Sequence, residues 1–202
     1  MRIVAIILFF ALCCSISLDA QQFGFKGSVI VDNSKVSFPD VDIDAKAGFN
    51  GGFVGNFNLP LTSWGINTGL LYSYRGFSLK NNYGDGRGIT FHFKTHGIEV
   101  PVNVYKEFNT IVLKPFLQAG LYASYTFSGR VNDGEASRSI EFEGKADRFD
   151  IGANISVGSK LTSKLRFLTS YGFGFAENKY IFSDQPISRK SRNLTFSLEY
   201  FL

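Results

Sequence analysis

The segment WGINTGLLYSYR, residues 64–75, separates into two faces when every second residue is read. Side chains of a strand alternate between the two sides of a sheet. One face is mostly large and apolar or aromatic: Trp64, Ile66, Thr68, Leu70, Tyr72 and Tyr74. The other is mostly small or polar and ends in a charge: Gly65, Asn67, Gly69, Leu71, Ser73 and Arg75. The segment predicts a strand whose apolar face meets either a protein core or lipid.

The same alternation recurs in seven further segments, each around ten residues or longer: 23–31, 47–59, 96–106, 113–127, 148–160, 165–175 and 193–202. This is the length that a tilted strand needs to cross a bilayer. The pattern predicts an all-β fold, an eight-stranded antiparallel up-and-down transmembrane β-barrel. Pro101 lacks an N–H for the strand ladder and would fit a local bulge.

The connections between these segments alternate in length. Three are tight: 60–63, 107–110 and 161–164. Four are long and polar: 32–46, 80–92, 129–146 and 177–192. Outer-membrane barrels have short periplasmic turns and longer extracellular loops. We therefore expect both termini on the periplasmic side and four long loops outside the cell.

The chain begins with Arg2 and an apolar run that ends at Ala20. This is typical of a secretory signal peptide, with a transmembrane anchor as the alternative. We expect a signal peptide over residues 1–20 and a barrel domain over 21–202. Both cysteines, Cys13 and Cys14, lie in the signal, so disulfides would not hold the mature chain together.

The composition favours β structure and argues against several classes of partner. The chain has 22 Phe, 9 Tyr, 21 Gly and only 5 Pro. The net charge of +4 is unchanged when the signal is removed, because Arg2 and Asp19 leave together. No basic run or zinc-ligand spacing is present, so nucleic acid is not an expected partner.

Aromatic residues concentrate near the ends of the expected strands, as in membrane-interface girdles. They are Phe57, Trp64, Tyr72, Tyr74, Tyr125, Phe127, Tyr171 and Tyr200. The opposite faces are rich in Gly, Ser and Asn, which suit a crowded barrel interior. The apolar face of the last strand could also serve as a signal for the outer-membrane insertion machinery. These features favour lipid over the alternative, a soluble lipocalin-like ligand-binding barrel.

Five segments together resemble the PorT-like outer-membrane β-barrel family: FGFKGSVIV (23–31), GLLYSYRG (69–76), IEVPVNVYK (98–106), KPFLQAGLYASY (114–125) and FDIGANISVG (149–158). The resemblance implies an eight-stranded barrel in the outer membrane and carries no catalytic residues. One member of that family is tied to protein secretion. Membership in a secretion or transport assembly is therefore one expectation for this chain.

The polar faces carry charges that would meet inside the barrel: Lys26, Arg75, Glu99, Arg148, Asp150, Lys160, Arg166 and Glu199. Eight strands leave an interior just wide enough for side chains to fill. We expect these residues to form a network of ion pairs and hydrogen bonds that plugs the lumen. A narrow conduction path is the alternative. Glu99 lies in the middle of its strand and needs a basic partner.

His92, Lys94 and His96 share one face near a long loop. They could contact lipid phosphate or simply be solvated. The sharper alternative is a lipid A-modifying enzyme with His96 as base, which would also need a serine and a carboxylate nearby.

The segment with Asp40, Asp42 and Asp44 lacks the glycine and distal glutamate of a calcium loop. We therefore expect no metal and no other cofactor.

The sequence therefore predicts a non-enzymatic integral outer-membrane protein with a structural or interaction role. The expected partners are outer-membrane lipid and lipopolysaccharide, the insertion machinery, and a protein bound at the extracellular loops.

Overall fold

The computed structural model describes most of the chain after the predicted signal peptide, namely residues 21–32, 35–37, 41–45, 47–82, 88–108, 110, 114–132, 137–139, 141–142, 144, 146–182 and 185–202. The signal peptide, residues 1–20, lies outside these ranges, and so does Asp40. Among the described residues, no helix is both long and apolar enough to span a bilayer.

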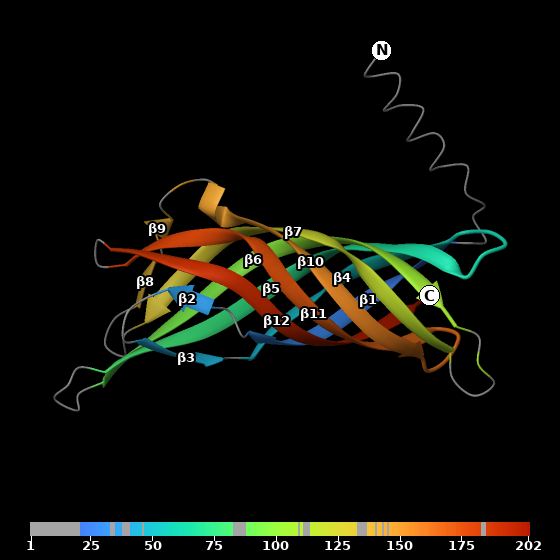
Figure 1. Ribbon diagram of the computed structural model, residues 1–202, viewed down its shortest axis with the longest axis horizontal. Helices are drawn as coiled ribbons and strands as arrows, with labels where there is room; N and C mark the ends of the chain where they lie inside the picture. The colour runs from blue at the N-terminus through green and yellow to red at the C-terminus, as the bar shows by residue number, and fades with distance from the viewer. Residues whose placement is uncertain are drawn as a thin grey trace, which may run out of the picture.

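Eight long strands form one closed barrel (Figure 1), as the alternating pattern predicts. They are β1 (Gln21–Asp32), β4 (Ala47–Asn58), β5 (Trp64–Asn82), β6 (Gly88–Glu107), β7 (Lys114–Asn132), β10 (Phe149–Lys160), β11 (Leu165–Phe182) and β12 (Gln185–Phe201). Each is antiparallel to its neighbours. Closure leaves no open sheet edge, which is a condition for strands to cross lipid.

The barrel closes where β1 pairs with β12, from Gly24 opposite Phe201 to Asp32 opposite Asn193. The two strands approach closely at Gly24, where an added Cβ would lie 2.0 Å from the Tyr200 carbonyl oxygen. The last residue continues the seam, because the Leu202 N–H donates to the Phe23 carbonyl at 2.9 Å. The two ends of the described chain are thereby fastened together.

The apolar side chains point outward and the polar ones inward. Phe53 is 64% exposed, and Leu70, Phe149 and Ile155 are similarly open, whereas Asn67 on the inner face is 0% exposed. The segment 64–75 divides as its alternation predicts, with Trp64 and Leu70 outside. A contiguous apolar exterior of this extent marks a surface built for lipid. A lipocalin-like barrel would have the reverse arrangement, with its apolar face around a ligand.

The long connections predicted from the sequence are partly wrong, because the strands continue through much of them. Loop 80–92 contains the ends of β5 and β6, which pair up to Asn82 opposite Gly88. Loop 177–192 is a hairpin in which β11 and β12 pair up to Phe182 opposite Gln185. Beyond the apolar band the apolar side chains change to the inner face: Phe93 of β6 and Val131 of β7 are buried, whereas Lys94 and Arg130 are exposed.

Four short strands add to this end of the barrel (Figure 1): β2 (Lys35–Ser37), β3 (Val41–Ala45), β8 (Ser137–Ser139) and β9 (Glu141–Phe142). They pair with β12, β5, β7 and β11 respectively. We call this the hairpin end. The opposite end, with the connections 59–63, 108–113 and 161–164, is the turn end.

The bulge expected at Pro101 is not there. Pro101 stays in register with Tyr122 of β7, and β6 and β7 instead shift register between His96 and Gly97. The Pro101 carbonyl accepts a hydrogen bond from the Thr68 hydroxyl at 2.8 Å. A ladder can lose one N–H donor without gaining a residue, so the proline alone does not force a bulge.

Candidate functional site

Among the described residues, eight charged side chains form ion pairs inside the barrel, four cations and four carboxylates. They fall into two groups. The hairpin-side cluster contains Arg75, Glu99 and Asp150. The turn-side cluster contains Lys26, Glu107, Lys160, Arg166 and Glu199. The charges sum to zero over the two clusters, which is the condition for burying so many of them.

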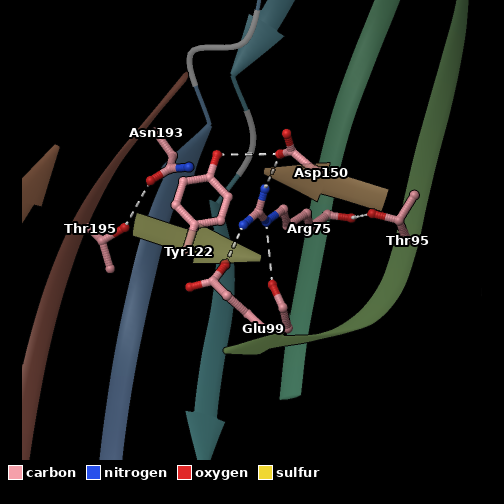
Figure 2. A network of polar contacts seen from close by, with 8 residues as sticks. Arg75, Thr95, Glu99, Tyr122, Asp150, Asn193 and Thr195 are labelled. Carbon is pink, nitrogen blue, oxygen red and sulfur yellow. Dashed lines mark hydrogen bonds and ion pairs between the residues drawn. The ribbon is translucent and has the colours of Figure 1, made fainter. Parts of the chain in front are cut away.

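Arg75 is the centre of the hairpin-side cluster (Figure 2). Its Nη2 donates to Glu99 Oε2 at 2.6 Å, and its Nη1 lies 3.9 Å from Asp150 Oδ2. The Tyr122 hydroxyl donates to the same Asp150 oxygen at 3.3 Å. The Arg75 Nε donates to the Ser73 hydroxyl at 3.3 Å. Arg75 of β5 therefore links side chains of β6 and β10, and Tyr122 of β7 joins them through Asp150.

Glu107 is the centre of the turn-side cluster. Its Oε1 lies 2.5 Å from Lys160 Nζ and 3.0 Å from Arg166 Nη2. The Arg166 guanidinium also lies over aromatic rings, with Cζ 5.1 Å from the centres of both Tyr105 and Phe201. A guanidinium over aromatic faces is stabilised by the ring quadrupoles, more so when desolvated. Ion pairing and aromatic packing thus hold the same buried cation.

Glu199 of the turn-side cluster is fully buried, with 0% exposure. Its Oε1 lies 3.4 Å from Lys26 Nζ. Among the described residues, neither carboxylate oxygen of Glu199 has a partner in good hydrogen-bond geometry. Glu199 is also directly opposite Arg166 in the β11–β12 register. Its stabilisation therefore depends on nearby positive charge more than on directed hydrogen bonds.

Arg148 was expected in this network, and the structure places it elsewhere. It ends a 3-10 turn, η2 (Ala146–Arg148), that precedes β10. Its Nη1 donates to the Phe127 carbonyl at 3.3 Å. The 3-10 turn interrupts the alternation, so the inward parity of β10 cannot be extended back to residue 148.

Sequence reasoning missed Glu107, the residue that binds both Lys160 and Arg166. It was assigned to a turn, whereas β6 runs to Glu107. The inward parity of Glu99, Asn103 and Tyr105 continues to residue 107, and that signal could have found it. Phe201 is on the opposite face of the last strand from Leu198 and Tyr200. It is buried in the lumen against Arg166.

Side chains fill the interior around the clusters. A cavity of about 20 Å³ lies beside Arg75 and Asp150, and another of about 40 Å³ lies beside Lys26 and Glu99. These volumes hold roughly one to a few water molecules each. Leu71, Ile30, Val54 and Leu168 are buried in the same interior. The arrangement is that of a plugged barrel.

The hairpin-side cluster predicts unequal losses in the free energy of unfolding for two substitutions. Arg75→Met leaves Glu99 and Asp150 buried without their shared cation, which costs about 3–5 kcal/mol. Glu99→Gln keeps a hydrogen-bond acceptor and leaves Arg75 with Asp150, so it costs only about 1–2 kcal/mol. Urea unfolding of the refolded barrel measures both. Equal losses for the two variants would contradict the central role of Arg75.

The predicted girdle residues lie on the outer wall, most of them near its two edges. At the turn end, Lys106 Nζ lies 5.2 Å from the Trp64 ring centre. At the other edge, Tyr74 packs on Phe49 at 5.3 Å, and Tyr125 packs on Phe149 at 4.8 Å. Phe57 and Tyr200 belong to the turn-end edge. Tyr72 and Phe127 belong to the other edge, and the centres of their two rings are 6.4 Å apart.

The height of this wall agrees with membrane dimensions. Ten residues separate Trp64 and Tyr74 on β5. At about 3.4 Å per residue and a tilt near 40°, they span roughly 26 Å, close to the usual apolar band of about 25 Å. Tyr171 differs from the expectation, because it lies six residues into β11 and thus within the band.

The outward histidines lie just past the Tyr72 and Tyr74 edge. His96 Nδ1 is 2.5 Å from the Tyr72 hydroxyl, and His92 Nδ1 is 2.9 Å from the Ser78 hydroxyl. A hollow of about 370 Å³ opens here, lined by His92, Lys94, His96, Ser128, Arg130 and Asn132. Arg130 was not anticipated, because its segment was assigned to a long loop.

Comparison with known proteins agrees with this geometry. A family model described as "Outer membrane protein beta-barrel domain" matches residues 19–180. The chain belongs to this family. No curated protein matches it.

Solved structures share the fold of this outer-membrane barrel. OprG from Pseudomonas aeruginosa is 8% identical with a TM-score of 0.57, and the alignment covers 90% of this chain and 95% of OprG. Ail, the attachment invasion locus protein of Yersinia pestis, is 12% identical with a TM-score of 0.50, covering 90% of this chain and 99% of Ail. At these identities the likeness concerns the fold alone.

The described part of the outer-membrane barrel contains no group of three His, Cys, Asp or Glu side chains that could hold a metal ion. The acidic segment lies partly outside it: Asp42 and Asp44 are in β3, but their side chains are not described, and Asp40 is not described at all.

Proposed function

We propose that this outer-membrane barrel is a non-enzymatic structural and interaction protein that meets its partners through the hairpin end. The observation that carries the proposal is the length of the strands beyond the apolar band. β5 continues eight residues past Tyr74, to Asn82. At about 3.4 Å per residue and the usual tilt, this is roughly 20 Å of paired strand beyond the lipid.

The hairpin end would face the outside of the cell, because outer-membrane barrels keep their short turns in the periplasm. Its paired strands form a preorganised surface, and binding to such a surface costs less ordering entropy than binding to a flexible loop. The plugged lumen supports the same function, since a barrel that conducts little acts through its surfaces. Membrane lipid and lipopolysaccharide surround its outer wall.

Export and assembly fit this proposal. A signal peptide over residues 1–20 would send the chain to the periplasm. Phe196, Leu198 and Tyr200 on the outward face of β12, followed by the exposed Leu202, form a pattern that the outer-membrane insertion machinery could recognise. The PorT-like assignment, with a place in a secretion or transport assembly, is the narrower form of the proposal. It is supported by the resemblance of segments such as 69–76 and 98–106.

Shortening one hairpin tests the interaction role. Residues 177–190 pair mainly with each other, so a tight turn can replace them without disturbing the barrel wall. We expect the shortened barrel to stay in the outer-membrane fraction and to keep its shift between unboiled and boiled gel samples. Chemical cross-linking at the cell surface should join the wild-type barrel covalently to its partners, and the shortened barrel should lose these cross-linked products. Unchanged cross-linked products in the shortened barrel would contradict an interaction role for this hairpin.

The lipid A-modifying enzyme is the second candidate, and one contact favours it. His92 and the Ser78 hydroxyl lie 2.9 Å apart on the outer wall. Ser78, however, is only 1% exposed, so a substrate cannot reach its hydroxyl. The described residues that line the hollow include no carboxylate to orient a histidine.

His96→Ala separates the two candidates. We expect an unchanged lipid A profile by mass spectrometry, because the described lining of the hollow offers no carboxylate to orient His96 as a base. Loss of a lipid A species in this variant, with the barrel still folded by the gel shift, would favour the enzyme.

A further inference from the structure

We propose that the hollow on the outer wall binds the phosphate group of a glycolipid in the outer leaflet. We call it the basic hollow and define it by His92, Lys94, His96, Ser128, Arg130 and Asn132. The proposal rests on the outer-membrane location of the barrel. It does not depend on any partner at the hairpin end, so the two proposals can fail separately.

The charges in the basic hollow are arranged for an anion. Lys94 of β6 and Arg130 of β7 are direct cross-strand neighbours, and both are exposed. Like charges in that position repel and destabilise a sheet unless something neutralises them. Within the described part of the chain, neither side chain makes an ion pair. No described carboxylate lines the hollow. A bound anion between the two cations would remove the repulsion.

The neighbouring groups suit a phosphate. Lys94 offers a compact point charge, and Arg130 offers a planar fork that matches two phosphate oxygens. Ser128, opposite His96, adds a hydroxyl donor in the same hollow. A volume of about 370 Å³ leaves room for a phosphate with part of its sugar.

The level of the hollow identifies the source of the phosphate. His96 is opposite Tyr74, at the aromatic edge. Lys94 is opposite Gly76, two residues closer to the hairpin end. Two residues at the usual tilt correspond to roughly 5 Å beyond the aromatic edge, which is headgroup depth. Directly below lie the exposed apolar side chains of Ile98, Val100 and Phe127. A molecule with a phosphate above and acyl chains below would contact both surfaces at once.

A lipid titration with matched variants tests this assignment. The refolded full-length mature barrel in detergent is titrated with lipid A that carries both phosphates, and with the same lipid A after enzymatic dephosphorylation. The temperature at which the folded gel band is lost reports binding, because a ligand of the folded state raises it. The test variant is Lys94→Gln with Arg130→Gln. The control variant, Lys106→Gln with Lys114→Gln, removes the same charge from the turn ends of the same two strands.

We expect the wild type and the control to prefer phosphorylated lipid A by at least tenfold in half-saturating concentration. The test variant should lose that preference. Without lipid its transition temperature should equal or exceed that of the wild type, because a repulsion is gone, and this result shows that the variant folds. A wild type that binds both lipids equally would overturn the proposal, as would a test variant that keeps the preference. Equal protection by soluble glucosamine phosphate would overturn the assignment to a lipid.

Discussion

Replacing Arg166 with methionine is expected to lower the free energy of unfolding by about 3–5 kcal/mol, because a buried carboxylate loses a partner. Methionine fills much of the same volume, so cavity formation contributes little. The guanidinium, however, is 3.0 Å from Glu107 and lies over the rings of Tyr105, Phe116 and Phe201. The Asn56 side-chain amide also lies 2.9 Å from Arg166 Nη2. One substitution removes all of these contacts together.

A double variant separates the charge from the packing. In the Arg166→Met variant Glu107 still has Lys160 as its ion-pair partner. Adding Glu107→Gln breaks that pair, so it should cost about another 1–2 kcal/mol if charge pairing holds the cluster, and almost nothing if only the packing of Arg166 matters. Urea unfolding in detergent, followed by tryptophan emission and by the gel shift, measures the free energies. A single variant within about 0.5 kcal/mol of the wild type would show that Arg166 does not hold the turn-side cluster.

Replacing Leu121 with arginine is expected to cost about 2–4 kcal/mol for folding into lipid vesicles, because it places a charge on the lipid face near mid-membrane. Leu121 is 56% exposed and lies between Val102 of β6 and Ala153 of β10. On a water-facing surface the same change would cost almost nothing. The size of the loss therefore reports directly which solvent this face meets.

Leu161→Arg is the matched control for this experiment. Leu161 is 53% exposed, almost the same as Leu121, but lies in the turn 161–164 outside the apolar band. We expect a change of less than about 1 kcal/mol, because cost falls toward the interface. Folding yields in vesicles and urea titrations give the two values. Equal effects of the two substitutions would contradict the membrane orientation of the barrel.

The sequence alone determined the strands and their two faces within the membrane. The alternation in 64–75 placed Leu70 outside and Asn67 inside, because each residue's side of a strand depends only on its position along it. The same reasoning placed all eight expected lumen charges on the inner faces of strands, and seven of them lie inside the barrel. Arg148 differs, because a 3-10 turn ends the alternation before it.

Only the tertiary structure decided which residues meet. Glu107 and Arg166 are separated by 59 positions and come together because β6 and β11 face the same narrow lumen. Lys94 and Arg130 became neighbours through the register of β6 against β7 beyond the bulge at His96. At the hairpin end the apolar side chains change to the inner face, as with Phe93 and Val131, so the apolar-outside pattern of the membrane band could not be extended there. Periodicity is a property of one strand, whereas register, closure and lumen contacts depend on all eight strands together.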